Sequence, residues 1–166
     1  MPTETLSFRD TGYFSSLICD YVEANEAISN LYNRFPTLEA FKGQITEKSQ
    51  SFKDENRAVL VDVLKVQYSD INASDLTMEH IESLLSSKTF TVTTGHQLNL
   101  FTGPLYFLHK IISVVNLAKS FSEKYPDNQF VPIFWMASED HDFEEISYFN
   151  FRGRKVRWNK ESAGAV

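Results

Sequence analysis

The sequence has very little cysteine and no long apolar run. Cys19 is the only cysteine among 166 residues, so no disulfide can form within the chain, as is common in reducing compartments. No stretch reaches the roughly 18 apolar residues of a membrane span. The first ten residues lack the basic and apolar regions of a secretory signal. We therefore expect a cytoplasmic protein with no membrane contact, in which Cys19 packs within a helix.

The sequence also lacks an excess of positive charge. Sixteen basic residues stand against 22 acidic ones, which gives a formal net charge of −6. Such a balance gives no electrostatic reason to bind nucleic acid. Residues 151–160 carry five basic side chains and two aromatic ones, which could contact nucleic acid. We favour the alternative, a solvated hairpin that turns at Gly153.

The first 88 residues are predicted to form a helical segment. Apolar residues over 14–35 recur at spacings of three, four and seven, which predicts one helix. Asp10 or Thr11 would cap its start, and Pro36 would end it. Further helices are predicted around residues 38–45, around residues 59–68, and from an N-cap at Thr77 to residue 85.

The pattern changes to an α/β type at residue 89. Residues 89–94 are rich in β-branched side chains and predict a strand, which Gly95 would break. Pro104 suits the first turn of a helix whose apolar arc extends to Phe121. Residues 130–137 form a nearly continuous apolar run, typical of a parallel strand covered on both faces. We therefore predict a βαβ unit within a second segment, residues 89–166.

Two polar loops follow the predicted strands. In open parallel sheets, ligands bind outside the carboxyl ends of the strands, here residues 95–97 and 138–142. Gly95 would let backbone approach a ligand, and the N–H groups before Gly103-Pro104 could hold an anion. The loop is neither a Walker A nor a GxGxxG motif. The alternative is a βα turn that merely needs glycine.

Three side chains near the first loop are candidates for chemistry. His96 could donate to a developing phosphate or carboxylate charge or act as a general acid. Gln97 offers both a donor and an acceptor for reading a substrate. Lys110 could neutralise a phosphate. Surface hydrogen bonding for His96 and a solvated helix face for Lys110 are the alternatives.

The second loop concentrates acidic residues. Residues 138–145 hold five carboxylates and one histidine, directly after the second predicted strand. They could bind Mg²⁺, hydrogen-bond a sugar or ammonium group, or pair a base with its orienting acid. Zinc could bind through His141 and Asp142, although no HExxH motif is present. The alternative is a helix N-terminus, where acids cap and complement the dipole. We expect no resident metal.

The two loops together are more specific than either alone. The residues concerned are Thr94-Gly95-His96-Gln97, Thr102-Gly103-Pro104-Leu105-Tyr106, Lys110-Ile111-Ile112 and the run from Val131 to Glu145. This pattern resembles the bacillithiol-biosynthesis cysteine-adding enzymes, from about residue 6 to the last residue and most sharply over 93–146. The resemblance implies that this α/β chain is the amino-terminal part of a longer protein. That protein would have a Rossmann-like core and a coiled-coil domain linked to homodimer formation.

The resemblance also implies a reaction. Those enzymes are assigned the joining of the carboxylate of cysteine to the amine of glucosaminyl-malate. A carboxylate is a poor acyl donor, so ATP is expected as a cosubstrate that forms an acyl-adenylate or acyl-phosphate. Mg²⁺ could accompany ATP, and no tightly bound cofactor is expected. The core is similar to that of class I aminoacyl-tRNA synthetases, although the HxGH signature is missing.

Site roles follow from the resemblance by position. Catalytic roles are expected of His96, Asp140, His141 and Asp142. The last three would handle the amino sugar or the cysteine ammonium, and one of them could serve as base for the attacking amine. Substrate or nucleotide binding is expected of Gly95, Gln97, Gly103, Pro104, Tyr106, Lys110, Trp135 and Glu139. Trp135 would form an apolar wall, and Glu139 would orient its neighbours. Two alternatives stay open: a noncatalytic nucleotide-binding or assembly module, and a nucleotidyltransferase acting on another carboxylate.

Overall fold

The computed structural model describes residues 3–100, 103–140 and 142–161. The chain divides into two compact units, Met1–Ser51 and Phe52–Val166. The division lies earlier in the chain than residue 88, where the sequence predicts the end of the helical segment. That predicted boundary stays a prediction. Among the described residues, no helix is both long enough and apolar enough to cross a membrane.

The first unit contains several short helices instead of the single helix predicted over residues 14–35. They are α1 (Phe8–Thr11), α2 (Ser16–Val22) and the 3₁₀ helix η1 (Glu26–Leu31), followed by α3 (Ala40–Ser51). The prediction that Asp10 or Thr11 caps this helix is also wrong, because both residues lie within α1. The helix expected around residues 38–45 is confirmed as α3.

Side-chain caps explain why the predicted helix is interrupted. The Ser15 side chain accepts a hydrogen bond from the N–H of Ile18, and Asn25 accepts one from Ala27. Ala24, between the two helices, has a φ of 53°, a left-handed conformation that a continuous helix does not contain. Local capping therefore overrides the apolar spacing. Cys19 is buried in α2, as expected of a packing residue.

The second unit begins with two helices, α4 (Asp54–Tyr68) and α5 (Asp75–Ser83). The predicted end of α4 near Tyr68 is confirmed. The predicted N-cap Thr77 is wrong, because the Ser74 side chain accepts from the N–H of Thr77 and so caps α5 three residues earlier.

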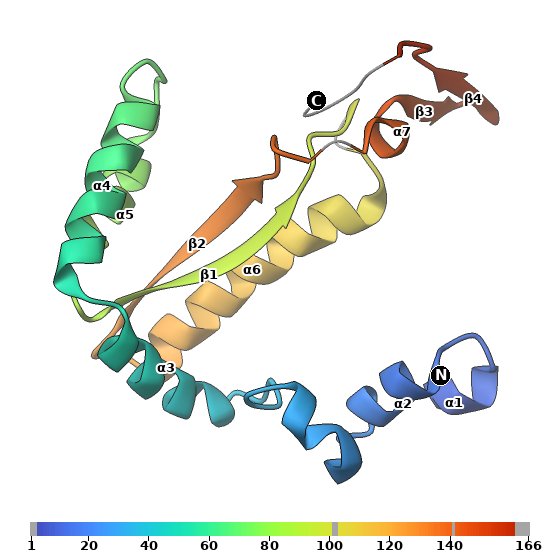
Figure 1. Ribbon diagram of the computed structural model, residues 1–166, viewed down its shortest axis with the longest axis horizontal. Coiled ribbons are helices and arrows are strands. Elements are labelled where there is room, and N and C mark those ends of the chain that lie inside the picture. The colour runs from blue at the N-terminus through green and yellow to red at the C-terminus, as the bar shows by residue number, and fades with distance from the viewer. Residues whose placement is uncertain (1–2, 101–102, 141, 162–166) are drawn as a thin grey trace. The chain divides into compact units, whose positions relative to one another are not determined.

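The predicted βαβ unit is confirmed (Figure 1). Strands β1 (Thr89–His96) and β2 (Gln129–Met136) are parallel, and α6 (Leu105–Lys124) connects them. Gly95 does not break β1 but pairs with Trp135. A Cβ at residue 95 would lie 3.0 Å from both Cβ and O of Trp135. Glycine is therefore the residue that lets the strand continue beside a bulky neighbour.

The core of this unit lies at the amino ends of the two strands. Phe130 and Val131 are both buried and, as neighbours in a strand, point to opposite faces. Phe130 contacts Phe121 of α6, with ring centroids 5.3 Å apart. Val131 belongs to a cluster with Val61, Ile81 and Leu84, from α4, α5 and the residue that follows α5.

The prediction that β2 is covered on both faces holds only for its first half. Trp135 and Met136, at its carboxyl end, are each 57% exposed. A run of apolar residues cannot show where along a strand the covering helices stop.

A short helix and a hairpin follow β2. Helix α7 (Phe143–Ile146) leads into strands β3 (Tyr148–Phe151) and β4 (Arg154–Arg157), which pair antiparallel. Arg152 and Gly153, between them, both have positive φ, 49° and 75°, as expected of a two-residue hairpin turn. The predicted hairpin is confirmed.

Candidate functional site

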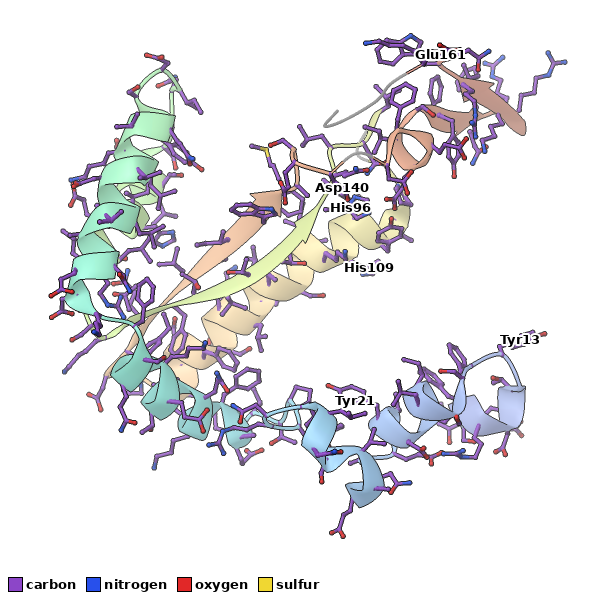
Figure 2. The ribbon with its side chains drawn as sticks, viewed as in Figure 1. Tyr13, Tyr21, His96, His109, Asp140 and Glu161 are labelled. Carbon is purple, nitrogen blue, oxygen red and sulfur yellow. The ribbon has the colours of Figure 1, made fainter. Side chains whose placement is uncertain are left out.

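The carboxyl ends of β1 and β2 lie side by side. His96 pairs with Met136 in the parallel register, and the N–H of Ala137 donates to the carbonyl of His96 over 3.2 Å. Figure 2 shows His96 and Asp140 at this end of the sheet. The loop after β1 and the segment after β2 therefore meet where a parallel sheet places its ligands.

His96, Tyr106 and Glu145 form the central group of side chains, here called the His96–Tyr106–Glu145 cluster. The Nε2 atom of His96 lies 2.6 Å from the Tyr106 hydroxyl, which donates to Oε1 of Glu145 over 3.0 Å. The Nε2 atom is also 3.3 Å from that carboxylate oxygen, and the His96 side chain is only 8% exposed. The cluster joins β1, α6 and α7.

Two partners surround the other nitrogen of His96. The Nδ1 atom lies 2.9 Å from the carbonyl oxygen of Gln97 and 3.0 Å from the amide nitrogen of Asn99. A protonated Nδ1 donates to the carbonyl, whereas an unprotonated Nδ1 accepts from Asn99. The surroundings thus provide a partner for each protonation state.

The electrostatics keep Tyr106 protonated. Desolvation and then the hydrogen bond to Glu145 raise the pKa of Tyr106 above its ordinary value. Its single hydroxyl proton goes to Glu145, so Nε2 of His96 acts as the donor to the tyrosine oxygen. Hydrogen bonds then run in one direction, from imidazole to phenol to carboxylate.

A pocket of about 820 Å³ opens beside the cluster, within the size range of small-molecule sites. The loop after β1, the start of α6, the end of α7 and β3 all contribute to it. Polar and aromatic side chains in its wall include Asn99, Tyr106, Glu145, Tyr148, Asn150 and Phe151. Such a wall can hydrogen-bond a polar ligand and stack against its apolar face.

Gln97 and Lys110 lie near the end of β1 with different surroundings. Gln97 is 3% exposed, and neither its side-chain oxygen nor its nitrogen has a hydrogen-bond partner within the described parts of the chain. The ammonium of Lys110 donates to the carbonyl of Gly95 over 3.1 Å and lies 5.6 Å from the centre of the Tyr106 ring. Their expected ligand-binding roles stay predictions.

Local structure accounts for much of the acidic segment after β2. Asp142 is the N-cap of α7, where its Oδ1 accepts from the N–H of Glu145 over 3.1 Å. Asp140 accepts from the N–H of Asp142, and Glu139 accepts from the Trp135 indole over 3.0 Å. His141 lies outside the described residues. Over residues 3–100, 103–140 and 142–161, no group of three or more His, Cys, Asp or Glu could hold a metal ion.

A family model described as the bacillithiol biosynthesis BshC N-terminal Rossmann-like domain matches residues 1–166. The chain belongs to this family. A protein of Flavobacterium johnsoniae named "Putative cysteine ligase BshC" is 58% identical over 166 residues, covering 100% of this chain and 31% of that protein. A relative of the same name from Flavobacterium psychrophilum is 56% identical over 167 residues. The match covers 100% of this chain and 32% of that protein.

More distant members of the BshC family show the same partial coverage. The relative from Bacillus thuringiensis, which carries the same name, is 33% identical over 142 residues, 85% of this chain and 26% of that protein. The chain spans about a third of the length of the two Flavobacterium relatives. The Rossmann-like fold expected for the start of a larger protein is confirmed.

Around the pocket of this BshC-family domain, the structure brings together only some of the expected residues. His96 and Tyr106 are in contact, and Gly103, Pro104 and Tyr106 line the pocket. Asp140, Asp142, Trp135 and Glu139 are not among the residues that line it. Their expected roles in the site stay predictions.

Several residues of the site were not assigned a role from the sequence, among them Asn99, Glu145 and the β3 residues Tyr148, Asn150 and Phe151 of the pocket wall. Asn99 contacts His96, and Glu145 contacts Tyr106 and lines the pocket. A signal for Glu145 was present, because it lies three residues after Asp142, the spacing of a reciprocal helix cap. That spacing predicts a helix start at Asp142 but not the contact with Tyr106.

Proposed function

We propose that the full-length protein is a ligase of bacillithiol biosynthesis, joining the carboxylate of cysteine to the amine of glucosaminyl-malate. The supporting observation is a pocket with Tyr106 and Glu145 in its wall and His96 in contact with both, at the carboxyl ends of the strands of a BshC-family domain. This chain would supply part of the active site, and the remaining two thirds of the protein would supply the rest.

The amine substrate fits the chemistry of the pocket wall. The Glu145 carboxylate can attract an ammonium group, and the amides of Asn99 and Asn150 can hydrogen-bond hydroxyl groups. The rings of Tyr148 and Phe151 can cover the apolar face of a sugar. An amino sugar presents all three features.

The carboxylate substrate requires activation, because oxide is a very poor leaving group. We propose that ATP converts the carboxylate of cysteine into an acyl-adenylate or an acyl-phosphate. The loop that leads to Gly103-Pro104 and the ammonium of Lys110 are the groups of this chain that suit phosphate oxygens. No resident metal is assigned, and no step depends on one.

The proposal is tested with the full-length protein, cysteine, glucosaminyl-malate and ATP. We expect an ATP-dependent thiol product, measured after thiol labelling. His96→Ala should lower the yield about 10-fold or more, because it removes one end of the cluster. His109→Ala is the matched control, since His109 is an exposed histidine on α6. A wild-type protein that forms no product would contradict the proposal, and equal yields from the two variants would contradict the placement of the site.

A rival activity is separated by a second assay. A nucleotidyltransferase acting on another carboxylate would exchange pyrophosphate into ATP with that acid and not with cysteine. We expect cysteine to support the highest exchange rate if activation proceeds through an adenylate.

A further inference from the structure

Glu145 is held at both its backbone and its carboxylate. Its N–H donates to Asp142, which caps α7, and its Oε1 accepts from the Tyr106 hydroxyl. The side chain nevertheless stays 43% exposed and lines the pocket. A carboxylate that is fixed in position and still open to a pocket suits contact with a ligand.

No lysine or arginine of the described residues forms an ion pair with this carboxylate. Among the described residues, His96 is the only basic side chain recorded within 4 Å of it. Lys110 donates to the carbonyl of Gly95, and Arg157 lies 3.7 Å from the neighbouring Glu144. Lys155 stacks on the ring of Tyr148, 3.6 Å from its centre. Within the described parts of the chain, Glu145 therefore has no permanent ion pair that would compete with a ligand amine for its carboxylate.

His96 and Tyr106 can hold the Glu145 carboxylate in place whether the imidazole of His96 is neutral or charged. The Tyr106 hydroxyl donates to the charged carboxylate, and Nε2 of His96 donates to the tyrosine oxygen. The carbonyl of Gln97 and the amide of Asn99 provide partners for Nδ1 in either protonation state. The hydrogen bonds that orient Glu145 thus persist whether or not the imidazole carries a charge.

We propose that Glu145 is the catalytic base that receives the proton of the attacking amine, and that His96 and Tyr106 are positioning residues that hold its carboxylate. This inference rests on the proposed ligase function. It assigns the base to a residue of α7 itself, beyond the Asp140–Asp142 segment that the sequence indicated. The geometry that supports it is the contact of Glu145 with Tyr106 and His96, together with its position in the pocket wall.

The step balances as an acyl transfer. The bound ammonium first loses one proton to solvent. The lone pair of the resulting neutral amine then attacks the carbonyl carbon of the acyl-adenylate or acyl-phosphate, and the C–N bond forms. The nitrogen then carries a positive charge and becomes far more acidic than a free ammonium, so a carboxylate can take its proton. The bond from the carbonyl carbon to the phosphate oxygen breaks, and its electron pair leaves with AMP or phosphate.

The test compares Glu145→Gln with Glu144→Gln in the full-length protein. Both are glutamates of α7, but Glu144 has an 86% exposed side chain and does not line the pocket. Each variant is assayed twice, for amide formation with glucosaminyl-malate and for hydroxamate formation with hydroxylamine. Hydroxylamine is uncharged at neutral pH and attacks activated acyl groups without a base.

We expect Glu145→Gln to slow amide formation about 100-fold or more, which is the typical contribution of a general base. Hydroxamate formation should stay within about twofold of wild type, because activation of the carboxylate does not need Glu145. Glu144→Gln should retain both rates.

Three outcomes would overturn the inference. Amide formation by Glu145→Gln at the rate of Glu144→Gln would show that Glu145 is not the base. Equal loss of amide and hydroxamate in a folded variant would place Glu145 in activation instead. A wild-type protein that forms neither product would refute the proposed function itself, and the inference with it.

The positioning roles are tested by a conservative and a disruptive change at His96. In His96→Gln the amide nitrogen can take the place of Nε2 and donate to Tyr106, whereas His96→Ala leaves no donor. We expect His96→Gln to keep kcat within about threefold, and His96→Ala and Tyr106→Phe to lower kcat about 10-fold with little change in KM. A folded His96→Gln protein as impaired as His96→Ala would overturn the positioning role.

Discussion

The two ends of the β1–β2 sheet differ in how they are stabilised. At the amino ends, Thr89, Phe130 and Val131 are at most 6% exposed. At the carboxyl ends, Trp135 and Met136 are each 57% exposed, and the polar cluster around His96 is held by hydrogen bonds. The same pair of strands therefore carries a packed core at one end and the polar groups of the candidate site at the other.

The two ends of the strands should therefore contribute differently to the stability of the fold and to the proposed reaction. Apolar side chains at the amino ends contribute through area removed from water. Each hydrogen bond at the carboxyl ends contributes about 0.5–1.5 kcal/mol to stability, or about 1.5–3 kcal/mol where the acceptor is charged, because it replaces a hydrogen bond with water. Changes at the core should therefore affect folding, and changes at the cluster should affect the reaction.

Removing a core ring should have the largest effect on stability. Phe121 is 3% exposed and packs against Phe130, so Phe121→Ala should lower the free energy of unfolding of this unit by about 3–5 kcal/mol. Hydrogen exchange of α6 and β2 peptides in the full-length protein measures the loss locally. Phe151→Ala, at a ring that is 57% exposed, is the control and should cost much less. A loss below about 1 kcal/mol for Phe121→Ala would contradict the placement of the core.

Two glycines test whether the loop after β1 has a required shape. Gly103 and Gly153 both have positive φ, 62° and 75°, but only at Gly103 would a Cβ meet a neighbour, 2.5 Å from Cβ of Asn99. Both alanine variants should lose about 1–2 kcal/mol from the left-handed backbone. Gly103→Ala should lose about 1–3 kcal/mol more, because Asn99 must move.

Activity separates the same two variants. Gly103→Ala should impair thiol formation by moving Asn99 away from His96, whereas Gly153→Ala should retain it. The comparison fails if the two proteins have the same melting temperature and the same activity.

The elements of the second unit could largely be predicted from sequence, because their signals are local. The apolar arc of α6 and the β-branched residues of β1 each indicate one structure within a few residues. The helix expected over residues 14–35 failed because apolar spacing continues across the caps at Ser15 and Asn25. Short-range side-chain hydrogen bonds of this kind compete with helix continuation.

The candidate site was only partly predictable, for a different reason. His96 and Gly103 could be recognised by their place after a strand. The hydrogen bond between Tyr106 and Glu145 joins residues 39 positions apart, and it depends on where α7 lies relative to α6. No local pattern in the sequence carries that information.

Replacing the buried amide of Gln97 should raise the free energy of unfolding, whereas the changes at Phe121 and Gly103 should lower it by larger amounts. Its two polar atoms lack partners among the described residues, and an unsatisfied buried polar group costs about 1–3 kcal/mol. Gln97→Met should therefore raise the stability of the unit by about 1 kcal/mol, measured by hydrogen exchange of β1. Gln129→Met, at an exposed position of β2, should change it little. Destabilisation by Gln97→Met would show that the amide has a partner in the full-length protein.

The smallest expected effect is a change in alkaline titration. The pKa of Tyr106 is raised above its ordinary value of 10.0, so folding favours the protonated phenol. The resulting stability is complete below pH 10 and is lost as the pH rises through the folded-state pKa. Tyrosinate absorbance should show a late-titrating group that is lost in Tyr106→Phe. The same group should remain in Tyr13→Phe, a change at a 90% exposed position. If Tyr106→Phe instead removed a step in the absorbance curve near pH 10, the contact between Tyr106 and Glu145 would be contradicted.

Hydrogen exchange of the full-length protein during turnover tests most directly whether the reaction takes place at the carboxyl ends of β1 and β2. The protein is compared with and without cysteine, glucosaminyl-malate and ATP. We predict that substrates slow exchange in peptides covering residues 96–106 and 143–151, and leave peptides at residues 129–132 unchanged. Product formation with no protection at 96–106 and 143–151 would contradict the account.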